Sequence, residues 1–357
     1  MLHPYTPILA AFLAAGMHTA AFAQASNVLP CHENARKCAT ELRAQSPVKK
    51  MSYWVSAFKK PVEQRVGIAA DELVAYLNFD NIAGGISNKP HATPVPEDFL
   101  KDVKDAITEL PPRIQKLISK KLAGIYFVKD LGGTGYTDYI DNGKFGPSAG
   151  FVVLDIDVLL KNSANAWATW KERTPFIPDP GYRLDAVIET GTQDNRKNAI
   201  QYILLHELGH VLAIGGIFHP LWGQSSGKAP LDGYPFAQLS WQYGVSDDFE
   251  YLSKFETQFP LRKNIAYYFG AKLNSNQMAM TYDQLEETSF PTLYAATNPS
   301  DDFAESFASY VHTVMLKRPL EIHIYRDGSN IKTSKPCWGE PRCAAKQRLL
   351  EDLLGVR

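Results

Sequence analysis

Residues 201–214 read QYILLHELGHVLAI, and this stretch holds the HExxH pattern at His206, Glu207 and His210. On a helix, residues four positions apart lie one turn above each other on the same face. His206 and His210 can therefore bind one metal ion, while Glu207 points to a neighbouring face, within reach of a water molecule on that metal. The stretch predicts two metal ligands and a general base.

The residues on either side of this pattern are apolar almost all round, which predicts a buried helix. Two histidines and a glutamate are costly in a buried helix unless they have partners. A metal ion would be such a partner, and a hydrogen-bonded core cluster without metal is the alternative. We expect one Zn²⁺ ion per chain.

A catalytic zinc ion usually has three protein ligands and one position for water. The first candidate for the third ligand is Glu305, in a helix that we expect over residues 301–315. Glu305 lies between Phe303 and Phe307, where an unpaired carboxylate would be costly. The alternative is that Glu305 belongs to a solvated face of this helix.

The second candidate for the third ligand is His219. The metzincin pattern HExxHxxGxxH would need glycine at position 213 and histidine at position 216, where this chain has Ala213 and Gly216. His219 comes three residues too late for that pattern. We expect His219 to line the cleft or to cap a turn before Pro220.

HELGH, together with the segment DFAESFA at residues 302–308, resembles the gluzincin metallopeptidases, in which the third ligand is a glutamate on a second helix. The chain is most similar to their lethal-factor-like and pro-pro endopeptidase branch and to related bacterial secreted peptidases. The resemblance covers residues 200–214 and 294–314. It implies a zincin-like catalytic domain with Glu305 as the third ligand, and a secreted zinc endopeptidase with Glu207 as the general base.

That branch places a catalytic tyrosine seven residues before its ligand glutamate. The corresponding position here is Asn298, and the nearest tyrosine upstream is Tyr294. We take Tyr294 as the candidate donor to the oxyanion of the tetrahedral intermediate. Tyr310 and His312 are further candidates, and a packing role is the alternative for each of the three.

Ligand imidazoles need hydrogen-bond acceptors for their second ring nitrogen. Asp301 and Asp302 are candidates for this role, with helix capping as the alternative. A substrate peptide can add as a strand to a sheet edge. The strand expected over residues 150–158 could be that edge, or a buried central strand.

The order of the elements predicts an α+β fold. Residues 24–122 are expected to form a helical N-terminal region, because helical apolar spacing dominates them. Residues 123–320 are expected to form the catalytic domain, with an insertion over about 215–291. Residues 321–357 are expected to form a C-terminal tail that carries a cysteine pair.

Residues 1–23 have the short apolar core and the small-residue end of a signal peptide, which predicts an exported chain, periplasmic or secreted, without a membrane anchor. The four cysteines are then expected to form Cys31–Cys38 and Cys337–Cys343 disulfides. The net charge of −1 gives no reason to expect nucleic acid as a partner. The expected partner is a protein or peptide substrate. Two other functions stay open: a zinc amidase that acts on cell-wall peptides, and a binding or toxin-like protein with a structural metal site.

Overall fold

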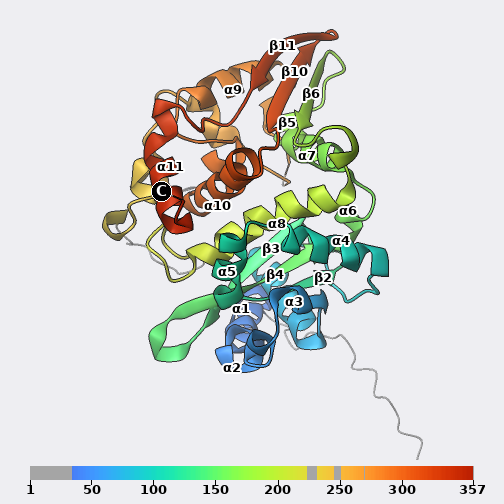
Figure 1. Ribbon diagram of the computed structural model, residues 1–357. Helices are drawn as coiled ribbons and strands as arrows, with labels where there is room; N and C mark the ends of the chain where they lie inside the picture. Colours follow the sequence, from blue (N-terminus) through green and yellow to red (C-terminus); the bar gives the residue numbers. More distant parts are fainter. Residues whose placement is uncertain (1–33, 223–230, 245–250, 269, 357) are drawn as a thin grey trace, which may run out of the picture.

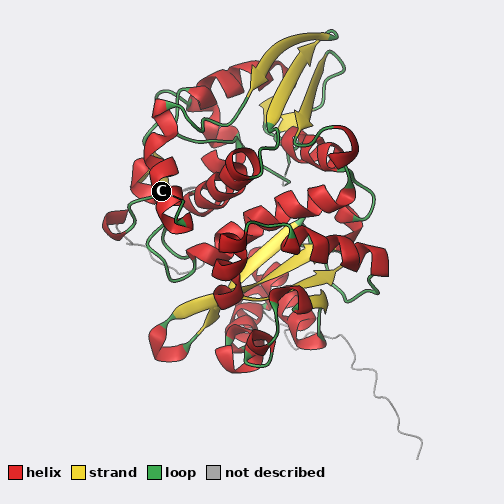
Figure 2. Ribbon diagram, in the orientation of Figure 1, coloured by secondary structure: helices red, strands yellow, loops and turns green. Residues whose placement is uncertain are grey.

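The structure is a computed structural model that describes residues 34–222, 231–244, 251–268 and 270–356. The expected signal peptide and Cys31 lie outside the described residues. The chain combines helices with several small sheets (Figure 2). Helix α8 (Arg196–Ala213), which carries the HExxH pattern, runs through the middle of the molecule between two layers (Figure 1).

The layer on one side of α8 is a four-stranded sheet in the order β1-β2-β4-β3. Strands β1 (Val66–Ile68), β2 (Leu122–Val128) and β4 (Pro147–Asp155) are parallel, and β3 (Gly135–Asp141) runs antiparallel to β4 at the edge. The strand expected over residues 150–158 is therefore the buried central strand, and β3 is the edge.

Alternating side chains of this sheet enter two separate cores, as the two-residue period of a strand requires. Ile125, Phe127, Val152 and Leu154 face the core shared with α8. Helices α4 (Glu97–Thr108) and α5 (Pro112–Lys121) cover the same face. The opposite face, with Phe151 and Val153, is covered by α2 (Met51–Trp54) and α3 (Asp71–Gly84), and α1 (Ala35–Gln45) packs on α3.

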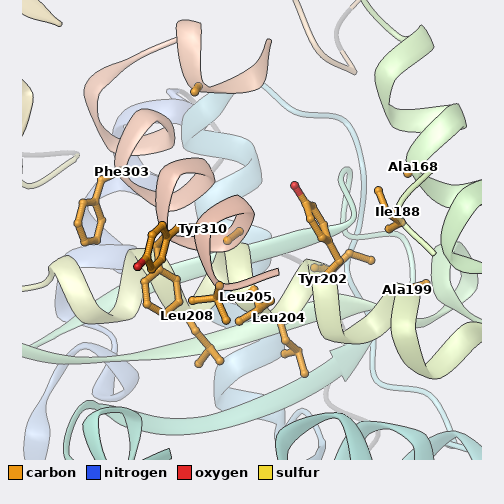
Figure 3. Close-up of a cluster of buried hydrophobic side chains, with 14 of the residues drawn as sticks. Ala168, Ile188, Ala199, Tyr202, Leu204, Leu205, Leu208, Phe303 and Tyr310 are labelled. Carbon is orange, nitrogen blue, oxygen red and sulfur yellow. The ribbon is translucent and has the colours of Figure 1, made fainter. Parts of the chain in front are cut away.

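The layer on the other side of α8 is built around α10 (Pro299–Tyr310), which packs directly on α8 and continues into a π-helical turn, Val311–Met315. Figure 3 shows side chains of both helices in one cluster, with Tyr202, Leu204, Leu205 and Leu208 of α8 near Phe303 and Tyr310 of α10. The remaining elements of this layer are α6 (Ile156–Leu159), α7 (Ala164–Arg173), α9 (Met278–Glu286), α11 (Ala344–Leu354), the sheet β6 (Tyr182–Val187), β10 (Glu321–Arg326), β11 (Ser329–Ser334), and the strand pairs β5 (Phe176–Ile177) with β9 (Leu273–Asn274) and β7 (Trp241–Tyr243) with β8 (Tyr251–Ser253).

The expected N-terminal region contains helices α1 to α5, but it also contributes β1 to the central sheet through its pairing with β2. In the C-terminal segment the expected Cys337–Cys343 disulfide is confirmed, just before α11. Because Cys31 lies outside the described residues, the pairing Cys31–Cys38 stays a prediction. Among the described helices, none is long and apolar enough to cross a membrane.

Candidate metal centre

Helix α8 is buried along almost its whole length, as its sequence predicts. It begins at the cap residue Asn195, whose side-chain oxygen accepts a hydrogen bond of 3.0 Å from the backbone N–H of Asn198. The side chains of His206 and His210 are each 12 % exposed. The two imidazoles thus lie at the floor of an accessible site, on an otherwise buried helix.

Three ligand atoms from α8 and α10 converge at this site. Nε2 of His206 lies 3.1 Å from Nε2 of His210. Oδ1 of Asp301 lies 3.3 Å from Nε2 of His210 and 3.8 Å from Nε2 of His206. Tetrahedral zinc with bonds of about 2.0–2.1 Å separates its ligand atoms by about 3.3 Å. Two of the three separations lie close to this value and the third is longer, so the three atoms form a group that could hold a metal ion.

Glu305 lies one helical turn after Asp301 and contacts the other nitrogen of His206. Its Oε1 atom is 2.9 Å from Nδ1 of His206, and its Oε2 atom accepts a hydrogen bond of 2.8 Å from the hydroxyl of Thr292. Since an ionised carboxylate only accepts hydrogen bonds, Nδ1 of His206 is the donor. In the neutral form that a metal ligand requires, Nε2 of His206 would then carry the lone pair that faces the cluster.

The structure therefore reverses the two roles that the sequence suggested for the carboxylates of Asp301 and Glu305. Asp301, a candidate second-nitrogen acceptor, lies in the ligand cluster, while Glu305, the candidate third ligand, accepts from His206. The side chain of Asn298, not that of Ser300 or Asp301, caps α10, with bonds of 3.0 Å and 2.9 Å from their backbone N–H groups. The hydroxyl of Ser300 is instead 3.2 Å from Nδ1 of His210.

Glu207 lies on the side of α8 that faces the edge strand β3. The hydroxyl of Thr137 donates a hydrogen bond of 2.6 Å to Oε2 of Glu207. A side chain at Gly135 would meet the Glu207 carboxylate, because a Cβ atom there would lie 2.8 Å from its Cδ. Thr137 thus holds the candidate base by a hydrogen bond, and Gly135 leaves room for it. Neither residue was identified from the sequence.

The ring of Tyr294 stacks on His206, with ring centroids 5.4 Å apart and an angle of 19° between the planes. Burial, reinforced by Asp301 and other nearby carboxylates, raises the pKa of Tyr294 well above its usual value. The phenol therefore stays protonated at neutral pH and can donate a hydrogen bond.

The other candidate residues make contacts elsewhere. Tyr310 donates to Glu351 over 3.4 Å, and Nε2 of His312 is 2.8 Å from the backbone oxygen of Ile188. His219 is buried, with Nδ1 2.8 Å from the backbone oxygen of Pro220, and it lies outside the ligand cluster. These contacts fit packing roles for the three side chains.

The charges of the site favour ionised carboxylates. Burial by itself would raise the pKa of Glu305, but Lys171, His206 and Thr292 together lower it to about 2. Burial likewise opposes the ionisation of Asp301, yet His210 and His206 bring its pKa below the usual value. Both carboxylates are thus charged at neutral pH, as metal binding requires.

A cavity of about 230 Å³ opens beside His206 and Glu207. It is bordered by the loop before β3, including Gly133, and by Trp167, Ile203, Tyr268 and Tyr294. The cavity thus lies directly next to the candidate base. Comparisons of the chain with protein-family models, with curated proteins and with solved structures found no match. The geometry of the site therefore carries the functional interpretation.

Proposed function

We propose that the chain is a zinc-dependent peptidase in which His206, His210 and Asp301 bind one zinc ion and Glu207 is the general base. The observation that carries this proposal is the convergence of two imidazole nitrogens of α8, the helix that also holds Glu207, and one carboxylate oxygen of α10 within 3.1–3.8 Å of each other. Two histidines and a carboxylate are a common ligand set of catalytic zinc, which leaves a position for water.

The position of Tyr294 supports the resemblance to gluzincins once Asp301 is taken as the ligand. The lethal-factor-like branch has its catalytic tyrosine seven residues before the ligand carboxylate. Counted from Asp301, that position is Tyr294, whose ring lies against His206. In this proposal an aspartate takes the place of the family's ligand glutamate. Glu305 orients His206 by accepting a hydrogen bond from its Nδ1.

Each residue of the site then has a defined task. Bound zinc would lower the pKa of a water molecule and polarise the scissile carbonyl. Glu207 accepts the proton of the attacking water and passes it to the leaving amine, and the hydroxyl of Thr137 keeps its carboxylate in place. The protonated phenol of Tyr294 donates to the oxyanion that develops on the substrate.

The edge strand β3 supports a peptide as the substrate. Within the described residues, β3 lies at the end of the sheet, and beyond its pairing with β4 it forms one isolated bridge, from its last residue Asp141 to Lys50. An extended peptide can add to such an edge through backbone hydrogen bonds. Because Gly135 and Thr137 of β3 contact Glu207, a peptide on this edge would pass directly beside the base.

Zinc titration and peptide hydrolysis by variants test the proposal. We expect the wild-type chain to bind one zinc ion and Asp301→Ala to lose it. Glu305→Gln should weaken zinc binding about tenfold to a hundredfold, as loss of an orienting partner does. Glu207→Gln should keep zinc and lose hydrolysis.

His219→Ala is the matched control and should retain both zinc and activity. A wild-type chain that binds no zinc overturns the proposal. A chain that binds zinc and cleaves cell-wall peptides but no polypeptide shows an amidase instead. If Asp301→Ala keeps zinc and Glu305→Gln loses it, Glu305 is the third ligand.

A further inference from the structure

A buried lysine lies directly behind the candidate metal centre. Lys171 of α7 has a side chain that is 5 % exposed, and its Nζ atom lies 3.0 Å from Oε1 of Glu172 and 3.3 Å from Oε1 of Glu305. Glu305 in turn accepts from Nδ1 of His206 over 2.9 Å. The ammonium group is thus linked to a candidate zinc ligand, His206, through one intervening carboxylate.

Lys171 is held from its other side by a second buried acid. Glu172 accepts hydrogen bonds from the hydroxyls of Tyr267 and Tyr282, over 2.8 Å and 3.1 Å, to its Oε2 atom. Its Oε1 atom is left to face Lys171. The two tyrosines therefore fix Glu172, and Glu172 fixes the ammonium group of Lys171.

The same ammonium group contacts the candidate oxyanion donor. Nζ of Lys171 lies over the ring of Tyr294, 4.8 Å from its centroid. A cation over a desolvated aromatic face is attracted by the negative potential of the ring. Because Tyr294 stacks on His206, Lys171 touches two neighbours of that imidazole at once.

A buried lysine is costly, and an apolar side chain of similar volume often packs as well or better. Packing alone therefore does not explain a charge at this position, whereas orientation does. Oε1 of Glu305 is shared by Lys171 and His206, and its Oε2 is bonded to Thr292, so three partners fix the carboxylate plane. Removing Lys171 would leave this carboxylate free to turn away from the imidazole.

We propose that Lys171 is a positioning residue of the metal centre. Its one ammonium group holds the carboxylate of Glu305 against His206 and also keeps the ring of Tyr294 in place over the site. The inference rests on the proposed function. It assigns Lys171 no contact with substrate or metal. Its effect should therefore appear in zinc affinity and in kcat, with little change in KM.

The test compares Lys171→Met, which keeps the length of the side chain and removes its charge, with Lys121→Met. Lys121 is the matched control, because its ammonium group bonds the backbone oxygens of Leu212 and Ile214 at the end of α8, away from Glu305 and Tyr294. Zinc affinity is measured by competition with a chelator, and kcat and KM are measured on a peptide substrate. We expect Lys171→Met to weaken zinc binding about tenfold to a hundredfold and to lower kcat, while Lys121→Met changes only stability.

Unchanged zinc affinity and kcat in a folded Lys171→Met variant overturn the inference and leave the proposed function intact. A wild-type chain without zinc overturns both. If Lys171→Met does not fold, Lys171→Arg is measured instead, since it keeps the charge but cannot place it at the same point. A Lys171→Arg variant with wild-type zinc affinity and kcat also overturns the inference.

Discussion

Gly209, inside the HELGH stretch, is the point where α8 and α10 touch, and its replacement by alanine tests the packing that builds the site. A Cβ atom at Gly209 would lie 2.8 Å from Cα, 3.2 Å from the backbone oxygen and 3.3 Å from Cβ of Ala304. Ordinary contacts between carbon atoms are about 3.5–4.0 Å. Since the nearest atoms are backbone, α10 itself must move away by about 0.7 Å or more.

Two opposing terms set the size of the effect. Glycine to alanine inside a helix normally stabilises it by about 1 kcal/mol. Overpacking of a close contact costs about 1–3 kcal/mol. We therefore expect Gly209→Ala to lower the free energy of unfolding by about 1 kcal/mol, the central value of the difference.

The same displacement reaches the metal centre, because Asp301 lies three residues before Ala304 on α10. A ligand set tolerates shifts of about 0.5 Å. We expect zinc affinity to fall at least about tenfold, since the shift exceeds that tolerance. Urea denaturation measures the stability, and chelator competition measures the zinc affinity.

Gly84→Ala is the control for the helix-propensity term. Gly84 is the exposed last residue of α3, and the nearest atoms to a Cβ there belong to the side chain of Ile86 at 3.9 Å. This variant should gain about 0.4–1 kcal/mol. If Gly209→Ala gains stability in the same way and binds zinc as tightly as the wild type, α8 and α10 do not pack as described.

Three further variants test other parts of the structure. Gly135→Ala should displace the Glu207 carboxylate from its hydrogen bond to Thr137 and lower kcat about a hundredfold or more. Metal analysis should show an unchanged zinc content. Full activity would contradict the placement of Glu207. Lys346→Met should lower the unfolding free energy by about 3 kcal/mol in urea, because it leaves the buried carboxylate of Asp302 without its charged partner. A change below about 1 kcal/mol would show that the ion pair of Lys346 and Asp302 is hydrated. Cys343→Ser opens the disulfide to Cys337, which spans a sequence separation of 6, and should lower the unfolding free energy by about 2 kcal/mol in urea. Equal stability of the wild-type chain with and without reductant would contradict this prediction.

The sequence predicted the α8 part of the site well because the information is local. The spacing of His206 and His210 and the apolar residues around them determine a buried helix with two imidazoles on one face. Glu207 follows from the same helix geometry. The structure places all three on α8, with His206 and Glu207 at the cavity beside β3 and Nε2 of His210 3.1 Å from Nε2 of His206.

The choice between Asp301 and Glu305 could not be made from the sequence, because both lie on the same face of one helix, four residues apart. Which of them reaches the imidazole pair depends on where α10 crosses α8. That crossing is fixed by the contact of Gly209 with Ala304, which places Asp301 at Nε2 of His210 and Glu305 at Nδ1 of His206. A contact between segments about a hundred residues apart leaves no periodic signal in the chain.

Strand β3 was also missed, for a physical reason. Its sequence, GYTDYID, mixes polar and aromatic residues with one aliphatic residue: Thr137 contacts Glu207 on one side, and on the other side the buried Ile140 accompanies a buried polar cluster. In that cluster Asp138 lies 2.9 Å from Nζ of Lys49 and accepts from the hydroxyl of Tyr136 over 3.1 Å. Because Ile140 is the one aliphatic side chain of this strand, hydrophobic periodicity gives only a weak strand signal there.

The short side chain of Asp301 and the small residues at the helix crossing belong to one arrangement. An aspartate reaches about one methylene less far than a glutamate, so its helix must lie closer to α8 for the carboxylate to meet Nε2 of His206 and His210. Gly209 and Ala304 provide that closeness, because no side-chain atom separates the two backbones there. On the same helix Glu305, one turn further on, meets Nδ1 of His206 instead. The close crossing thus brings Asp301 and Glu305 to the two nitrogens of one imidazole, that of His206, and Lys171 lies within hydrogen-bond distance of the second carboxylate.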